Sequence, residues 1–151
     1  MSNLSSILKS DAVLSLSKEV ILNLLCTNNY ITEKYAAFFK QFEITGPQFN
    51  VLRILRGQKG CPANLSTIQE RMVHKNSNAG RLIDKLLLKG LVERNTCKEN
   101  RRKIEVLITE KGLDLLSTID PELDKLENKN LLNFTKEEAT TLNKLLEKLR
   151  E

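Results

Sequence analysis

Asn78 and Arg81 are an asparagine and an arginine whose side chains could hydrogen-bond the edges of nucleic-acid bases. The carboxamide of asparagine can bond N6 and N7 of adenine, and the guanidinium of arginine can bond O6 and N7 of guanine. Three neighbouring polar residues complete this candidate set: Asn76, Ser77 and Lys85. The alternative is that all of them are ordinary surface residues, so the charge around them must be considered.

The positive charge of the chain is concentrated around these residues. The formal net charge is +5, and residues 70–111 hold 11 basic and 6 acidic side chains, so the rest of the chain is neutral overall. A second basic cluster lies in the same segment: Arg101, Arg102 and Lys103. A local excess of this kind is what binding to a polyanion requires, although a solvated charged face would have the same composition.

Residues for other kinds of chemistry are scarce. His74 is the only histidine, the three cysteines Cys26, Cys61 and Cys97 are far apart, and no Gly-rich phosphate loop is present. We therefore predict that the protein is not an enzyme and has neither a metal site nor a cofactor. An isolated cysteine is usually a small apolar residue, but Cys26 or Cys97 could also sense oxidants.

The first part of the chain has the apolar period of helices. Apolar residues recur at three- and four-residue steps from Ser17 to Phe42, which predicts one long helix. A second helix should start at Gly46-Pro47 and end at Gly57, because proline suits the first turn of a helix and glycine its end. The aromatic residues Phe38, Phe39 and Phe42 are expected to pack in the core rather than to line a ligand site.

Two shorter helices are predicted to follow. The third should be capped by Asn64 or Ser66 and face inward with Leu65, Ile68 and Met72. The fourth should end at Gly90 and have an apolar face formed by Ala79, Leu82, Ile83, Leu86 and Leu87. Its opposite side would then expose Ser77, Asn78, Arg81 and Lys85.

After Gly90 the apolar period changes to that of a strand. Residues 91–94 and 103–108 flank a polar tip at 96–102, which predicts a β-hairpin with a basic tip. Another helix should open at Thr109 or Glu110, and Pro121 should restart or kink it. The sequence Thr135-Lys136-Glu137-Glu138 is a capping box for a last helix, whose apolar stripe is Leu142, Leu145, Leu146 and Leu149.

The order of these elements is that of a winged helix-turn-helix, so the predicted fold class is mainly α with a small β-hairpin wing. We expect a single domain over 1–151, with a winged helix-turn-helix lobe at 45–111 and dimerisation helices at 1–42 and 112–151. The terminal helices have more apolar stripe than a monomer of this length readily covers, which predicts a homodimer. Because no 18-residue apolar stretch and no signal peptide are found, a soluble cytoplasmic protein without a membrane partner is expected.

Three segments of the chain form a pattern: residues 45–52, residues 77–86 with 89–94 after them, and Asn100-Arg101-Arg102 followed by Ile108-Thr109-Glu110-Lys111-Gly112. Together, in this order and spacing, they resemble the MarR family of multiple-antibiotic-resistance regulators. The resemblance implies a transcription regulator, commonly a repressor, that binds a pseudo-palindromic site on double-stranded DNA as a homodimer. It also implies that Ser77, Asn78 and Arg81 lie in the recognition helix and that Arg102 enters the minor groove.

The resemblance further implies a cleft that binds a small-molecule effector, often a phenolic or other aromatic anion, whose binding releases DNA. One position departs from the family pattern, because Asn100 stands where the family has an acid that pairs with the wing arginine.

Other functions remain open at this point. A winged helix can serve as a protein–protein interaction module, because the fold alone does not determine function. Such modules usually lack a basic recognition face, whereas this chain has one. A membrane-surface helix is disfavoured for the first long helix, because its polar face holds Glu19, Asn23, Asn28 and Glu33 rather than lysine and arginine.

Overall fold

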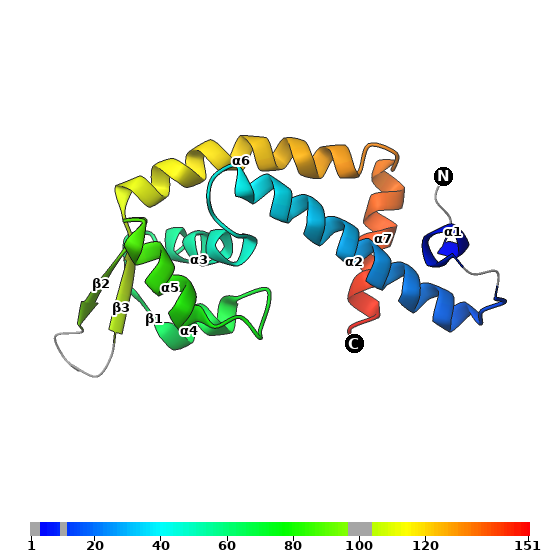
Figure 1. Ribbon diagram of the computed structural model, residues 1–151, viewed down its shortest axis with the longest axis horizontal. Helices are drawn as coiled ribbons and strands as arrows, with labels where there is room; N and C mark the ends of the chain where they lie inside the picture. The colour runs from blue at the N-terminus through cyan, green and yellow to red at the C-terminus, as the bar shows by residue number, and fades with distance from the viewer. Residues whose placement is uncertain (1–3, 10–11, 97–103) are drawn as a thin grey trace. The chain divides into compact units, whose positions relative to one another are not determined.

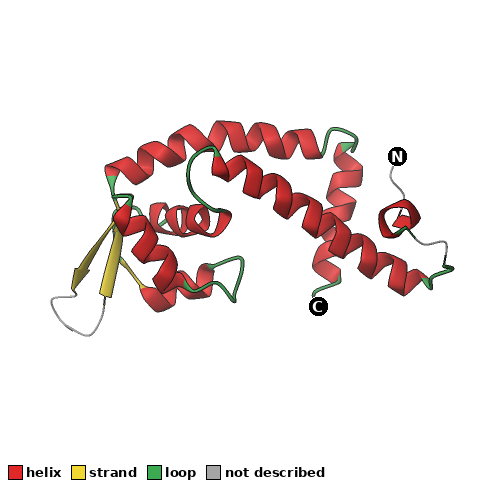
Figure 2. Cartoon of the chain, viewed as in Figure 1, coloured by secondary structure: helices red, strands yellow, loops and turns green. Residues whose placement is uncertain are grey.

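A computed structural model describes residues 4–9, 12–96 and 104–151 of the chain. The described residues form two compact units that divide between Phe49 and Asn50. The predicted wing tip lies outside the described residues, and with it Cys97, Asn100, Arg101, Arg102 and Lys103. Seven helices and three strands are present in the described ranges, so the predicted fold class, mainly α with a small β component, is confirmed (Figures 1 and 2).

The N-terminal unit consists of α1 (Leu4–Leu8), α2 (Leu16–Lys40) and the start of α3 (Gly46–Arg56). The long helix predicted from the apolar period is therefore found, whereas the five-residue α1 was not predicted because it is too short to show a period. At the end of α2 the rings of Phe38 and Phe39 lie 5.2 Å apart in an edge-on arrangement, and Phe39 lies 4.7 Å from Phe49. These aromatic residues pack against one another, as expected.

A reciprocal pair of hydrogen bonds begins α3. The backbone N–H of Thr45 donates to Gln48 Oε1 at 2.9 Å, and the backbone N–H of Gln48 donates to Thr45 Oγ1 at 3.3 Å. Gln48 is only 3% exposed, so its polar group is buried with a partner. This is a capping box, and α3 ends at Arg56, directly before Gly57, as predicted.

The second unit contains a three-stranded antiparallel sheet with the order β1-β3-β2. The strands are β1 (Ala63–Asn64), β2 (Val92–Thr96) and β3 (Ile104–Ile108), and Val106 in β3 lies opposite Ala63 on one side and Arg94 on the other. The predicted hairpin is thus confirmed, with β2 reaching Thr96, where the tip was expected to begin. Strand β1 was not predicted, because two residues after a proline are too few to show an alternating pattern.

Four helices complete this unit: α4 (Leu65–Arg71), α5 (Ala79–Leu88), α6 (Glu110–Asn130) and α7 (Lys136–Lys148). Asn64 rather than Ser66 caps α4, since Asn64 Oδ1 accepts from the backbone N–H of Thr67 at 2.8 Å. The predicted inward position of Leu65 is wrong: this side chain is 41% exposed, whereas Ile68 and Met72 are buried. Leu65 is the first residue of α4 and lines a cavity of about 90 Å³ together with residues of α5, β2 and β3.

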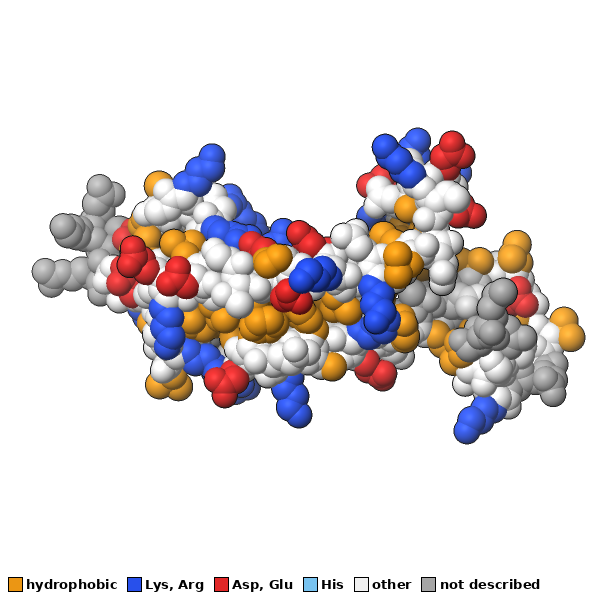
Figure 3. Space-filling model, turned by 90° about the horizontal axis from the view of Figure 1, so that it is seen from above, with side chains coloured by type: hydrophobic (Ala, Val, Ile, Leu, Met, Phe, Trp, Pro, Cys, Tyr) orange, Lys and Arg blue, Asp and Glu red, His pale blue; other side chains and the backbone are white. Residues whose placement is uncertain are grey.

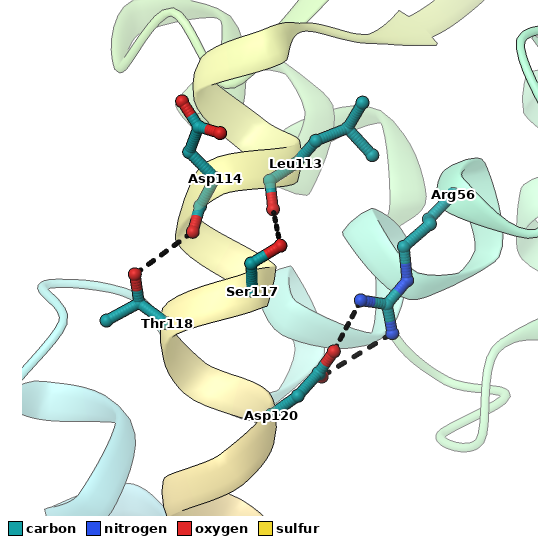
Figure 4. A network of polar contacts seen from close by, with 6 residues as sticks. All are labelled: Arg56, Leu113, Asp114, Ser117, Thr118 and Asp120. Atoms are coloured by element: carbon teal, nitrogen blue, oxygen red, sulfur yellow. Dashed lines mark hydrogen bonds and ion pairs between the residues drawn. The ribbon is translucent and has the colours of Figure 1, made fainter.

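Pro121 was expected to restart or kink this helix; α6 runs from Glu110 to Asn130 as one helix, so it does not restart at the proline. Ser117 Oγ and Thr118 Oγ1 each donate at 3.0 Å to a backbone carbonyl one turn earlier, those of Leu113 and Asp114 (Figure 4). Hydroxyl groups bonded in this way loosen and bend a helix, which helps it to accommodate the proline ring. Burial of Leu116, Ile119 and Leu123 on the packed face keeps the helix in one piece.

The capping box predicted for the last helix is present. Thr135 Oγ1 accepts from the backbone N–H of Glu138, and the backbone N–H of Thr135 donates to Glu138 Oε2 at 2.8 Å. Two hydrogen bonds from Thr135 lower the pKa of Glu138 below its usual value. The bond from the backbone N–H has the larger effect, and the bond from the hydroxyl has the smaller one. The helix α7 that follows has no buried residue.

Candidate nucleic-acid interface

Helix α5 separates apolar from polar residues as the sequence predicted. Ala79, Ile83 and Leu86 are buried, whereas four of the candidate DNA-contacting residues are exposed: Asn76, Asn78, Arg81 and Lys85. Ser77 is partly buried. Arg81 and Lys85 make no ion pair with any carboxylate among the described residues, so their charges are available to a ligand.

Asn78 has a structural role that the sequence pattern did not predict. It is the N-cap of α5, and its Oδ1 accepts from the backbone N–H of Arg81 at 3.0 Å. Two-point recognition of adenine needs both the oxygen and the nitrogen of the carboxamide. Because the oxygen caps the helix, the side-chain N–H₂ group is the part of Asn78 best placed to reach a base.

The turn between α4 and α5 is held by side-chain amides that the sequence pattern did not indicate. Gln69 Nε2 donates to the carbonyl of Lys75 at 2.9 Å, and Gln69 Oε1 accepts from the backbone N–H of Ala79 at 3.1 Å. Asn50 Oδ1 accepts from the backbone N–H of Val73 at 2.8 Å. Glutamine and asparagine inside predicted helices give no sequence signal for such bonds, because their partners come from the fold.

The end of α5 is tied to the start of α6. Gly90 follows α5 with a φ of 67°, and its carbonyl accepts from Thr109 Oγ1 at 2.8 Å. Thr109 Oγ1 also caps α6 by accepting from the backbone N–H of Gly112 at 3.2 Å. Lys111 Nζ donates to the carbonyl of Lys89 at 2.8 Å and places a positive charge at the C-terminal end of α5, where the helix dipole favours it.

Gly112 lies so close to its surroundings that no side chain fits. A Cβ built on this residue would overlap the carbonyl oxygen of Leu91 and lie 2.7 Å from Ile108 Cγ1. The sequence Thr109-Glu110-Lys111-Gly112 thus supplies a cap, a charge at the end of α5 and a point of close contact. These contacts fix where β2 and β3 leave the helical part of the lobe.

One ion pair connects the wing with α5. Arg94 Nη1 on β2 lies 3.5 Å from Asp84 Oδ1, and the two side chains are 43% and 64% exposed. A pair this open contributes little to stability because water screens it. Its effect on α5 is to neutralise the acid between Arg81 and Lys85, which leaves that face of the helix positive.

Other kinds of site are not seen in the parts of the chain that the structure describes. These ranges hold no group of three or more His, Cys, Asp or Glu residues that could bind a metal ion. None of their helices is long and apolar enough to cross a membrane. Cys26 is partly buried and Cys61 is exposed, and both are free thiols.

Comparison with known proteins places this geometry in a family. The MarR family model matches residues 44–104, the segment that contains α3, α4, α5 and β2 and ends at the first residue of β3. A MarR transcription factor from Planctomyces limnophilus of known crystal structure is 32% identical, with 90% of this chain and 98% of that chain covered and a TM-score of 0.70. The chain belongs to the MarR family.

Other similar proteins agree with this assignment. The HTH-type transcriptional regulator SarZ of Staphylococcus haemolyticus is 25% identical to this MarR-family chain, over 80% of its length and 87% of the length of SarZ. The organohalide-sensing regulator RdhR, crystallised with 2,4-dichlorophenol, shares the fold with a TM-score of 0.83 at 19% identity, covering 91% of this chain and 81% of that one. The MarR-family chain is therefore a transcription regulator and not an enzyme.

Proposed function

We propose that this MarR-family regulator represses transcription in the cytoplasm by binding a specific DNA site through α5. The observation that carries the proposal is the pair of exposed cations Arg81 and Lys85, which form no ion pair with the described residues and lie on a helix whose opposite face is buried. The major groove is wide enough for an α-helix, and arginine bonds guanine there. We assign base reading to Arg81 with Asn76, Ser77 and Asn78 beside it, and a phosphate contact to Lys85.

The wing provides the second part of the proposed contact. Strands β2 and β3 lead to the tip that carries Arg101, Arg102 and Lys103, which are outside the described residues. Narrow A·T-rich minor grooves have a strong negative potential that attracts an inserted arginine. We assign this role to Arg102 and phosphate contacts to Arg101 and Lys103.

Homodimer formation is part of the proposal. Two leucines of α7 and the leucine that caps its C-terminus are exposed, Leu142 at 38%, Leu145 at 58% and Leu149 at 53%. Hydrophobic side chains also lie at the surface of α1 and the first half of α2 (Figure 3), among them Leu16, Val20, Ile21 and Leu25. Large exposed apolar faces mark interaction sites, and a second copy of the chain would cover these.

A small aromatic or phenolic molecule is proposed as the effector. The support comes from RdhR, which has the same fold and was crystallised with 2,4-dichlorophenol. Binding of such a molecule would release the regulator from DNA if the molecule prefers the conformation that does not bind DNA.

The DNA-binding proposal is tested with duplexes that the protein selects from a random-sequence pool. We expect a palindromic consensus with half-sites about one helical turn apart, and an affinity that falls steeply between low and physiological salt. Light scattering at micromolar concentration should give twice the 17.2 kDa mass of the chain. A monomer that selects no consensus would contradict the proposal.

A further inference from the structure

The turn between α4 and α5 contains residues 72–78 and carries the candidate base-reading residues at its end. Within the turn the backbone N–H of Ser77 donates to the carbonyl of His74 at 3.0 Å, and two further bonds lead back to the end of α4, from the backbone N–H of Met72 to the carbonyl of Gln69 and from Lys75 Nζ to the carbonyl of Glu70. Side chains of the preceding helices hold the backbone of the turn: Asn50 on α3 binds Val73, and Gln69 on α4 binds both Lys75 and Ala79. The path of the turn is therefore determined by side chains of the preceding helices.

Gln69 differs from Asn50 because it contacts two backbone groups four residues apart in the chain. One partner is a carbonyl, that of Lys75, and the other is an N–H, that of Ala79. Only one orientation of the carboxamide satisfies both partners, since the reversed group would set oxygen against oxygen and N–H against N–H. The side chain thus fixes the distance between the middle of the turn and the first residue of α5.

The partner at Ala79 is significant for α5 itself. The first N–H groups of a helix have no partner within the helix. In α5 the N–H of Ala79 is satisfied by Gln69 and that of Arg81 by Asn78, so two side-chain oxygens hold the first turn from different elements. Ala79 is 1% exposed, which means that water cannot easily replace Gln69 at this position.

We propose that Gln69 is a positioning residue that sets the place of Asn76, Ser77, Asn78 and Arg81 relative to the rest of the DNA-binding lobe. Gln69 itself is not assigned a contact with DNA. The inference rests on the proposed function of α5, because it concerns the residues to which base reading was assigned. Base recognition needs side chains placed to within fractions of an ångström, whereas phosphate attraction tolerates displacement.

The test compares two substitutions at Gln69 with a control at another glutamine. Gln69→Met keeps the length of the side chain and removes both hydrogen bonds. Gln69→Glu keeps an oxygen that accepts from Ala79 and loses the donor to Lys75. Gln58→Met makes the same chemical change at a side chain whose buried Nε2 has no hydrogen-bond partner among the described residues.

Binding is measured on a duplex selected by the wild-type protein and on a random-sequence duplex of equal length. We expect Gln69→Met to weaken binding to the selected duplex about tenfold, which corresponds to about 1.4 kcal/mol, and binding to the random duplex less than twofold. Gln58→Met should leave the affinity for both duplexes unchanged. Equal losses on both duplexes for Gln69→Met, or no loss on either, would overturn the inference.

Hydrogen exchange of the Ala79 amide in the DNA-free protein provides a readout that does not depend on DNA. Its exchange should be at least tenfold faster in Gln69→Met than in the wild type and remain slow in Gln69→Glu, with every variant still folded at the temperature of the measurement. Unchanged exchange in Gln69→Met would overturn the positioning role even if the protein binds DNA. If the wild type selects no DNA while the exchange result is as expected, the proposed function fails and the positioning of the turn stands.

Discussion

Arg56 Nη1, at the end of α3, lies 2.5 Å from Asp120 Oδ2, on the central part of α6, and Arg56 Nη2 lies 3.4 Å from Asp120 Oδ1 (Figure 4). The two residues are 64 positions apart in the chain. Their side chains are 37% and 39% exposed, so water screens the pair in part. The two-point geometry nevertheless holds the end of α3 against α6, which a single contact would do less well.

A double-mutant cycle with Arg56→Ala and Asp120→Ala should give a coupling energy of at most about 1 kcal/mol, and the coupling should fall in high salt. The measurement is urea unfolding of the four proteins. Lys125 and Glu122 provide a matched control, since they lie 2.7 Å apart within α6 but are 72% and 52% exposed. If the coupling energy of this exposed pair equals that of Arg56 and Asp120, the two-point geometry does not strengthen the Arg56–Asp120 pair.

Gly112→Ala should destabilise the protein by about 2–3 kcal/mol, because the added methyl group overlaps the carbonyl oxygen of Leu91, a backbone atom that already accepts a hydrogen bond from the backbone N–H of Thr109. Gly57→Ala is the control: its Cβ would lie 3.4 Å from the nearest atom, the carbonyl oxygen of Ile54, which is an ordinary contact. That variant should stay within about 0.5 kcal/mol of the wild type. Thermal and urea unfolding give the free energy of unfolding of both variants. Equal destabilisation by Gly112→Ala and Gly57→Ala would contradict the close packing of Gly112.

Asn78→Ala should cost about 1 kcal/mol of stability through loss of the α5 cap. Asn78→Asp keeps the accepting oxygen and adds a negative charge at the helix N-terminus, so its stability should equal or exceed that of the wild type. The same variant should bind DNA more weakly, since the carboxylate cannot donate to a base and is repelled by phosphate. An Asp variant that is as unstable as the Ala variant would show that Asn78 is not acting as a cap.

Arg81→Ala should weaken binding to the selected duplex by about 1–3 kcal/mol and relax its sequence preference. Lys85→Ala should weaken binding to selected and random duplexes alike and reduce the salt dependence by the equivalent of about one phosphate contact. Titrations of both variants at two salt concentrations decide between the roles. If Arg81→Ala lost the same affinity for the selected and the random duplex, Arg81 would be a phosphate contact and not a base contact.

Arg102→Ala should lose more affinity on a site with A·T-rich flanks than on one with G·C-rich flanks, because the narrow A·T-rich minor groove attracts arginine more strongly. Binding is compared on two duplexes that share the selected core and differ only in their flanks. Lys103→Ala serves as the control for loss of one positive charge from the same cluster and should show no flank dependence. Equal losses for Arg102→Ala on both flanks would mean that this arginine does not read groove width.

Local patterns in the sequence were sufficient to predict most of the helices and the hairpin. The period of the apolar residues showed α2, α5 and the two long strands, and caps such as Thr135 and glycines such as Gly90 showed where elements start and end. These features depend on residues within about four positions of one another, which the chain alone specifies. The concentration of basic residues in 70–111 likewise indicated nucleic acid, because an excess of charge in one segment is a property of its composition.

The tertiary structure decided how the parts of the interface are held. Strand β1 forms because Ala63 pairs with Val106 on β3. The turn before α5 is held by Asn50, whose partner lies 23 residues away, and by Gln69, whose two partners lie 6 and 10 residues away. Leu65 is exposed although its spacing fits the apolar stripe, because α5, β2 and β3 leave a cavity beside it instead of covering it fully. Gly112 must be glycine because Leu91 comes close to it in space. Contacts of this kind depend on which elements meet after folding, and the spacing of residue types along the chain does not encode them.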